Sequence, residues 1–124
     1  MGAQENKQTA QEAYAAFSKG DAEGAMRNID DSVEWIVRGD NSLTGTHKGK
    51  QAVGELWGKY MSKDFSTEPH DFVADGDTVV VLTTARLDGE TVESADVLTY
   101  NADGKLVKFD TLGDETVPNR VYAR

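Results

Sequence analysis

The sequence predicts an α+β fold in which helices pack on one face of a curved antiparallel sheet. Apolar residues recur at helical spacing in the first half of the chain, whereas from Pro69 onward they recur at every second residue. Three Asp-Gly dipeptides, typical of tight turns between strands, follow at regular intervals: Asp75-Gly76, Asp88-Gly89 and Asp103-Gly104. We therefore expect helices first and hairpin-linked strands after them.

Three helices are expected in the first half of the chain. The first runs from about Gln4 to Lys19 and ends at Gly20, and its apolar stripe consists of Ala10, Ala13, Tyr14 and Phe17. Asp21 can cap a second, shorter helix, whose apolar stripe is Ala22, Ala25, Met26 and Ile29. A third helix begins near Lys50, and its broad apolar face consists of Val53, Leu56, Trp57, Tyr60 and Met61. The apolar face of this third helix is wide enough to cover a sheet.

The expected strands begin with Val33 to Val37, which places Val33, Trp35 and Val37 on one face. The Asp-Gly turns separate three further strands, near Thr78–Leu87, Thr91–Tyr100 and Lys105–Leu112. From about residue 115 we expect a tail, because Pro118 interrupts any strand and little apolar pattern remains. Together these elements predict one domain over residues 1–124.

Composition limits the classes of function. The chain has no cysteine, which excludes a disulfide framework, a thiolate metal site and a cysteine nucleophile. Its 13 basic and 22 acidic residues give a net charge of −9, so nucleic-acid backbones would be repelled. The amino-terminal residues lack the apolar core of a signal peptide, and no apolar run approaches the length of a membrane span. We therefore expect a cytoplasmic protein with no nucleic-acid or membrane partner.

Five phrases occur in a familiar order along the chain: SKGDAEGAM, DDSVEW, LTGTHKGKQAVGELW, VADGDTVVVL and YNADGKLVKFD. In them the chain resembles the nuclear transport factor 2-like superfamily, and within it the SnoaL-like polyketide cyclases and ketosteroid isomerases. The resemblance implies a cone-shaped, curved antiparallel sheet wrapped around three N-terminal helices, with an apolar pocket between them. It also implies a homodimer formed through the outer face of the sheet.

The same resemblance points to one carboxyl group. Ketosteroid isomerases keep a pocket aspartic acid protonated so that it donates a hydrogen bond to the oxyanion. The phrases DVLTY and DGKLV match that residue to Asp96. The general base of these isomerases falls at Trp35, or at Val37 without a gap, and the oxyanion tyrosine falls at Ala13, next to Tyr14. Neither Trp35 nor Val37 can take a proton, so steroid isomerisation by that mechanism is not expected.

The epoxide hydrolases of this fold fit less well. Their pair of aspartates falls at Thr111 and at Thr83 or Ala85, and none of these positions carries a carboxylate. As a further candidate base, His47 precedes the third helix in a glycine-bearing loop that could border the pocket. His47 and His70 show no metal-ligand spacing, so no metal is expected, and no cofactor either.

Two functions stay open for Asp96 and its surroundings. The first is a cofactor-free isomerase, cyclase or lyase that acts on a small apolar or carbonyl-bearing molecule, with Asp96 moving the proton. The second is a non-catalytic ligand-binding or dimerisation module of the same fold. By pattern alone a solvated or dimer-facing strand face suits Asp96 better, and with the resemblance the pocket and the surface are balanced. The expected pocket wall consists of Tyr14, Phe17, Trp35, Trp57, Met61, Thr83 and Leu98.

Overall fold

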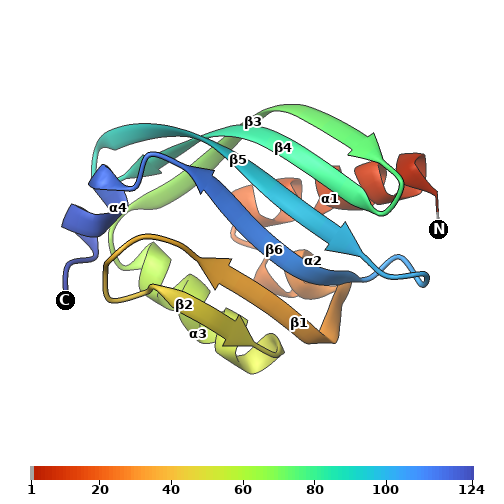
Figure 1. Cartoon of the computed structure of the whole chain (residues 1–124), viewed down its shortest axis with the longest axis horizontal. Coiled ribbons are helices and arrows are strands. Elements are labelled where there is room, and N and C mark those ends of the chain that lie inside the picture. The colour runs from red at the N-terminus through yellow and green to blue at the C-terminus, as the bar shows by residue number, and fades with distance from the viewer. Residues whose placement is uncertain (1) are drawn as a thin grey trace.

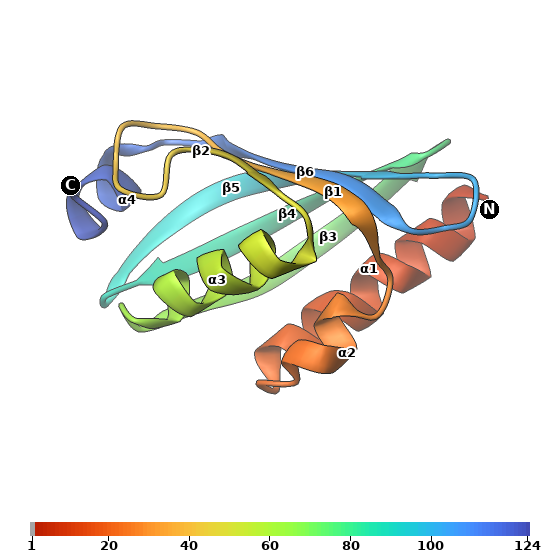
Figure 2. The ribbon, with the colours of Figure 1, turned by 90° about the horizontal axis from the view of Figure 1, so that it is seen from below.

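The computed structural model describes residues 2–124 and confirms the α+β class, with helices α1, α2 and α3 on one face of a curved, open sheet (Figures 1 and 2). The six strands are β1 (Ile29–Val37), β2 (Gly45–Lys48), β3 (Phe65–Asp75), β4 (Thr78–Leu87), β5 (Glu90–Tyr100) and β6 (Leu106–Gly113). The helices are α1 (Ala3–Ser18), α2 (Ala22–Met26), α3 (Lys50–Met61) and α4 (Thr116–Val121). None of these described helices is both long and apolar enough to cross a membrane.

The sheet has the order β2-β1-β6-β5-β4-β3, visible from one edge to the other in Figure 1. Strands β4 to β6 form the predicted antiparallel meander, and β3 extends it by one strand that was not given in the prediction. The glycine of each Asp-Gly turn has the positive φ that such turns require. The structure differs from the prediction at β1, which pairs in parallel with β6 and places Trp35 opposite Phe109. The edge strand β2, which pairs with β1, was not predicted because it has only four residues.

The helices bury most of the predicted apolar stripes, but Ala22 and Met61 are exposed. Asp21 caps α2 as expected, since its side chain accepts a hydrogen bond from the backbone N–H of Gly24 at 2.9 Å. Helix α2 ends earlier than predicted, and Ile29 is the first residue of β1. In α3 the most deeply buried residues are Val53, Leu56 and Trp57.

The expected tail after residue 115 is wrong, because the chain forms α4 and packs against the domain. Pro118 is the third residue of this helix, where its missing N–H costs nothing since the first turn has no intrahelical acceptors. Just beyond α4, Tyr122 is buried, and its hydroxyl donates to the backbone carbonyl of Tyr60 at 2.9 Å. The carbonyl of Tyr122 accepts from the N–H of Ser42 at 2.8 Å. These contacts anchor the C-terminal segment to α3 and to the β1–β2 loop.

The outer face of the sheet carries a continuous apolar surface. Because side chains alternate along each strand, the residues of β5 on either side of Asp96 point outward. The strand register aligns them in two rows across the sheet, Val73–Val80–Val97 and Leu82–Ala95–Leu112. Val73, Leu82 and Leu112 are among the exposed large apolar residues. We call these six residues the outer apolar patch.

Candidate functional site

A pocket of about 190 Å³ lies between the inner face of the sheet and the helices. Aromatic rings form much of its wall. Trp35 stacks on Phe109 with ring centroids 3.7 Å apart, because the parallel pairing of β1 and β6 places these residues side by side. Trp57 from α3 meets Trp35 edge to face at 5.6 Å, and Phe17 from α1 meets Trp57 at 5.3 Å. Such a wall suits a flat, largely apolar molecule.

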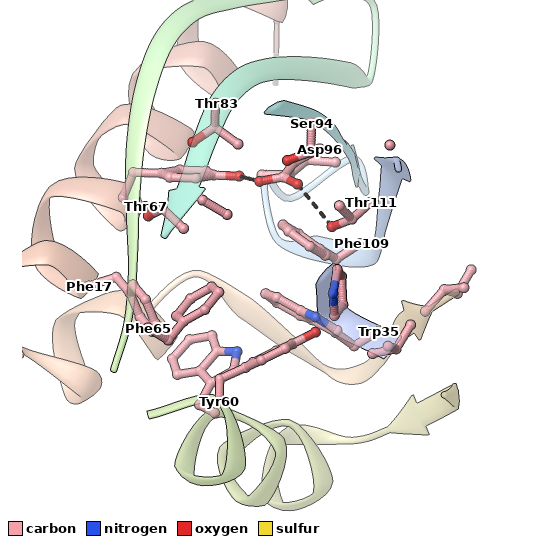
Figure 3. Close-up of a pocket in the computed structure, with 18 of the residues that line it drawn as sticks. Phe17, Trp35, Tyr60, Phe65, Thr67, Thr83, Ser94, Asp96, Phe109 and Thr111 are labelled. Carbon is pink, nitrogen blue, oxygen red and sulfur yellow. Dashed lines mark hydrogen bonds between the residues drawn. The ribbon is translucent and has the colours of Figure 1, made fainter. Parts of the chain in front are cut away.

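Asp96 is the one buried carboxyl group among the described residues, with 4% of its surface exposed. The alternation of β5 points it inward, on the same face as Leu98. One carboxylate oxygen accepts a hydrogen bond from the hydroxyl of Tyr14. The other accepts from the hydroxyl of Thr111 at 2.9 Å (Figure 3). The side chain is therefore neither solvated nor paired with a cation.

Burial and hydrogen bonding act on this carboxyl group in opposite directions. Loss of water disfavours the charged form and raises the pKa of Asp96 to about 6, while the hydrogen bonds from Tyr14 and Thr111 favour the charged form and limit that rise. Burial and the neighbouring Asp96 also raise the pKa of Tyr14 well above 10, so Tyr14 keeps its proton and donates it in a hydrogen bond. The pair combines a proton acceptor of near-neutral pKa with a permanent donor.

Strands β5 and β6 and helix α1 bring Asp96, Thr111 and Tyr14 together. Tyr14 lies on the inward stripe of α1 and packs edge to face on Phe72 of β3, with ring centroids 5.6 Å apart. Thr111 lies directly opposite Asp96 in the β5–β6 register. The sequence singled out Thr111 only as a position where an epoxide hydrolase would carry a carboxylate. Its contact with Asp96 depends on the strand register, which the local pattern does not reveal.

The structure brings most of the expected wall residues to the pocket: Tyr14, Phe17, Trp35, Trp57, Thr83, Asp96 and Leu98. Met61 is an error of the prediction, since it is 53% exposed and lies outside the pocket lining. Successive helical residues are turned by about 100°, so when Tyr60 faces the pocket Met61 points away. His47 is also absent from the lining; its ring nitrogen Nε2 instead lies 2.7 Å from the carbonyl oxygen of Leu43.

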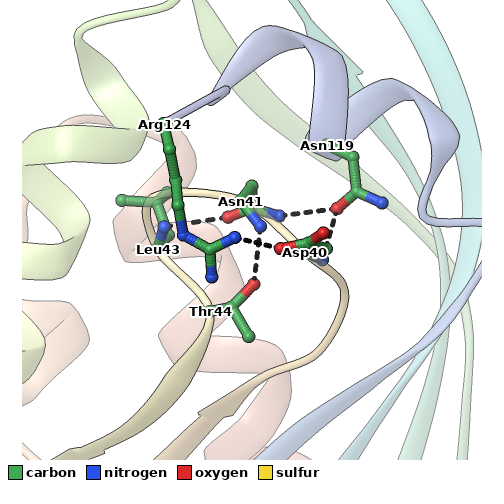
Figure 4. Close-up of polar contacts among 6 residues, drawn as sticks. All are labelled: Asp40, Asn41, Leu43, Thr44, Asn119 and Arg124. Atoms are coloured by element: carbon green, nitrogen blue, oxygen red, sulfur yellow. Dashed lines mark hydrogen bonds and ion pairs between the residues drawn. The ribbon is translucent and has the colours of Figure 1, made fainter.

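One end of the pocket is lined by the β1–β2 loop and the segment around α4, which contribute Arg38, Asn41, Leu43, Glu115, Pro118 and Tyr122. Figure 4 shows the polar contacts that hold the two together. The side-chain oxygen of Asn119 accepts from the N–H of Asp40 at 2.8 Å and from the side-chain amide of Asn41 at 3.0 Å. Asp40 also pairs with Arg124, and Asn41 is 2% exposed. The prediction of a tail missed this end of the site entirely.

Two threonines of the wall differ from Thr111 in their bonding. The hydroxyl oxygens of Thr67 on β3 and Thr83 on β4 are buried, and neither has a hydrogen-bond partner. Ser94, which lies opposite Thr83 in the β4–β5 register, also lines the pocket. Across residues 2–124, no cluster of three or more His, Asp or Glu side chains is placed to hold a metal ion.

The curved open sheet, the helices on its inner face and the pocket between them define a domain of the nuclear transport factor 2-like class, as the sequence resemblance implied. The chain belongs to the SnoaL-like domain family, which matches residues 10–109. No curated protein matches it.

Solved structures confirm the fold. A nuclear transport factor 2-like protein from Burkholderia xenovorans LB400 is 29% identical, with a TM-score of 0.81 over 98% of each chain. A protein of unknown function with a cystatin-like fold from Xanthomonas campestris is 26% identical, with a TM-score of 0.87 over 96% of this chain and 98% of that one. A provisionally assigned polyketide cyclase from Sinorhizobium meliloti is 17% identical, with a TM-score of 0.73 over 85% of this chain and 94% of that one.

Proposed function

We propose that this protein binds a small, largely apolar molecule bearing a carbonyl or hydroxyl group and transfers a proton on it without a cofactor, with Asp96 as the acid/base group. The observation that carries the proposal is the position of Asp96, a buried carboxyl in an apolar pocket with hydroxyl donors on both oxygens. Its surroundings favour a ligand whose polar atom meets Asp96 and whose ring lies against the aromatic wall.

The pKa of Asp96, raised to about 6, suits this role. At neutral pH the group is mostly a carboxylate that can take a proton, and its conjugate acid is strong enough to return the proton readily. In an isomerisation, Asp96 would remove a proton from a carbon next to a carbonyl, the C–H electron pair would pass into the enolate, and the proton would return to another atom of the same molecule. Such a shuttle consumes nothing and needs one carboxyl group.

Cyclisation of a polyketide, which the name of the Sinorhizobium meliloti neighbour implies for that protein, is another reaction of this class. It also requires an acid or base beside a flat, carbonyl-rich molecule. The stacked rings of Trp35 and Phe109 offer the flat surface that such a molecule needs.

A non-catalytic binding protein is the second candidate, and one observation favours it. The positions matched to the general base of the isomerases, Trp35 and Val37, both line the pocket and cannot accept a proton. No second buried carboxyl group exists among residues 2–124 to act in place of that base. The pocket would then hold its ligand through the aromatic wall and a hydrogen bond to Asp96.

Exchange of carbon-bound hydrogen separates the two candidates. Small ketones and lactones are incubated with the protein in D₂O, binding is followed by tryptophan fluorescence, and deuterium incorporation next to the carbonyl is followed by NMR. We expect the wild type to bind and exchange some of these probes, and Asp96→Asn to bind but not exchange. The control is Asp71→Asn, which removes a charge at an exposed position. Binding without exchange in the wild type would refute the enzyme and support the non-catalytic binding protein. No binding at all would overturn both candidates.

We also propose that the outer apolar patch pairs with the same patch of a second copy. Charges of both signs lie beside the patch, where Arg38 pairs with Asp110 at 2.8 Å, so that two copies can meet with opposite charges facing. Leu82 lies in the outer apolar patch, and we expect Leu82→Glu to halve the mass measured by light scattering after gel filtration. Met61→Glu, at an equally exposed apolar residue on α3, is the control and should keep the wild-type mass. A monomeric wild type would refute the pairing.

A further inference from the structure

The unpaired hydroxyls of Thr67 and Thr83 are the least explained feature of the pocket. Buried hydroxyl groups in proteins nearly always have a hydrogen-bond partner, because burial without one lowers the stability of the folded state. Both hydroxyl oxygens here are buried in the described structure and have none. By contrast, Tyr14 and Thr111 both donate to Asp96. Groups left unpaired in the wall of a pocket are candidates to bind a ligand atom.

The strand register places these hydroxyls at regular steps from Asp96 on the inner face of the sheet. Asp96 is opposite Val81, so Thr83 is its diagonal neighbour on the same face. Thr67 is opposite Ala85, so it is in turn the diagonal neighbour of Thr83. Such neighbours are about 7–8 Å apart, a step that one six-membered ring with oxygens on opposite carbons can bridge by hydrogen bonds. Figure 3 shows Thr67, Thr83 and Asp96 around the upper part of the pocket, and the aromatic rings of Phe17, Phe65 and Tyr60 below them.

Threonine can present its hydroxyl to the pocket without a change of shape. Its methyl and hydroxyl groups exchange places when the side chain moves between staggered rotamers, and the two groups have similar volumes. Thr67 and Thr83 already line the pocket. A rotation of either side chain therefore brings the hydroxyl to a ligand oxygen, and the hydrogen bond then formed removes the cost of the unpaired group.

The size of the pocket limits the part of the ligand that it holds. A cavity of about 150 Å³ lined by apolar side chains is known to bind benzene. The volume here is about 190 Å³, which leaves room for one ring and a few further atoms. We propose that the ligand places a single ring with two oxygen substituents in the pocket, one oxygen at Asp96 and the other at a second polar subsite formed by Thr83 and Thr67. This inference rests on the proposed function, because it requires the pocket to be the ligand site.

Matched probes test the second subsite directly. Cyclohexanol has one hydroxyl group and 1,4-cyclohexanediol has two on the same ring, so one hydroxyl can donate to Asp96 and the other can accept from a threonine. The affinity of each is measured by NMR titration and tryptophan fluorescence, and we expect the wild type to bind the diol at least tenfold more tightly than the alcohol. Thr83→Val, which replaces the hydroxyl with a methyl group, should make the two affinities nearly equal. Thr67→Val should reduce the ratio in the same direction.

Two controls separate a lost contact from a damaged fold. Thr99→Val makes the same replacement on the outer face of β5 and should leave the affinity ratio as in the wild type. The melting temperature of unliganded Thr83→Val should equal or exceed that of the wild type, because an unpaired buried hydroxyl has been removed. A lower melting temperature would show that the hydroxyl has a partner in the folded protein and would overturn the inference.

The outcomes distinguish this inference from the proposal on which it rests. If both probes bind, both lose affinity in Asp96→Asn, and Thr83→Val keeps the wild-type ratio, then the second subsite is refuted and the proposed function stands. If the wild type binds neither probe, the pocket does not accept a single oxygenated ring, and the inference fails together with its premise. If the ratio of the two probe affinities falls toward one only in the Thr83 and Thr67 variants, the second subsite is established.

Discussion

Replacement of Asp96 by asparagine is the sharpest test of the site, because it removes a buried charge and keeps the shape of the side chain. The amide oxygen can still accept from one hydroxyl, and the amide nitrogen can donate to the oxygen of the other, so Tyr14 and Thr111 both keep a partner. The expected effect is therefore electrostatic. It should appear as a change in how stability depends on pH.

The size of this electrostatic effect on stability follows from the pKa of Asp96, which folding raises from 3.8 to about 6. The folded state holds the proton more tightly than the unfolded state, so this group favours folding at low pH. That contribution is lost as the pH rises from about 4 to about 6. At 1.36 kcal/mol per pKa unit the total is about 3 kcal/mol, of which about 2 kcal/mol falls between pH 4 and pH 8. Asp96→Asn lacks this titration, so the free energy of unfolding of the variant relative to wild type should rise by that amount over the same range.

Urea denaturation followed by tryptophan fluorescence measures this difference at a series of pH values. Comparing the two proteins at each pH cancels the titration of the other carboxyl groups, whose contributions are common to both. A difference in unfolding free energy that stays constant from pH 4 to pH 8 would refute the reasoning, since it would mean that folding leaves the pKa of Asp96 unchanged. A carboxyl-carbon NMR titration of the wild type gives the same pKa independently.

Two further predictions concern the neighbours of Asp96 and the end of the pocket lined by the β1–β2 loop and α4. The hydrogen bond from Tyr14 lowers the pKa of Asp96, so Tyr14→Phe should move that pKa further above about 6, as measured by the same NMR titration. Asn119→Ala removes the oxygen that accepts from both Asp40 and the buried Asn41, so it should lower the free energy of unfolding by about 1–3 kcal/mol and speed amide hydrogen exchange in the β1–β2 loop. Asn119→Asp keeps the accepting oxygen and should lose less; equal losses in the two variants would contradict this account.

The parts of the fold that local pattern controls could be predicted from the sequence. The inward stripe of α1 and the Asp-Gly turns depend on residues close together in the chain, and both lie where the spacing placed them. The parallel pairing of β1 with β6 could not be predicted in this way, because it joins segments far apart in the sequence. Helix α4 was missed because Pro118 was considered only as a residue that interrupts a strand, although proline is well tolerated in the first turn of a helix.

The candidate site likewise contains features that could be predicted from the sequence and contacts that could not. The family resemblance pointed to a pocket position for Asp96, which strand alternation alone left open, and the helical stripe put Tyr14 on the apolar face of its helix. The structure joins the two side chains by a hydrogen bond. Thr111 escaped prediction because its contact with Asp96 depends on the exact alignment of β5 and β6. Met61 was misplaced because the whole apolar face of α3 was expected to point inward. Met61 directly follows the pocket-facing Tyr60, and one helical step of about 100° turns its side chain toward solvent.

The parallel pairing of β1 with β6 also has a consequence for how the chain folds. The β3–β6 meander can form from neighbouring hairpins, whereas β1 can join the sheet only after a long intervening loop has closed, which is entropically costly. The stack of Trp35 on Phe109 spans this pairing and can exist only once the loop is closed. The fluorescence of Trp35, isolated in a Trp57→Phe background, should therefore change in the last kinetic phase of refolding, when the pocket is completed.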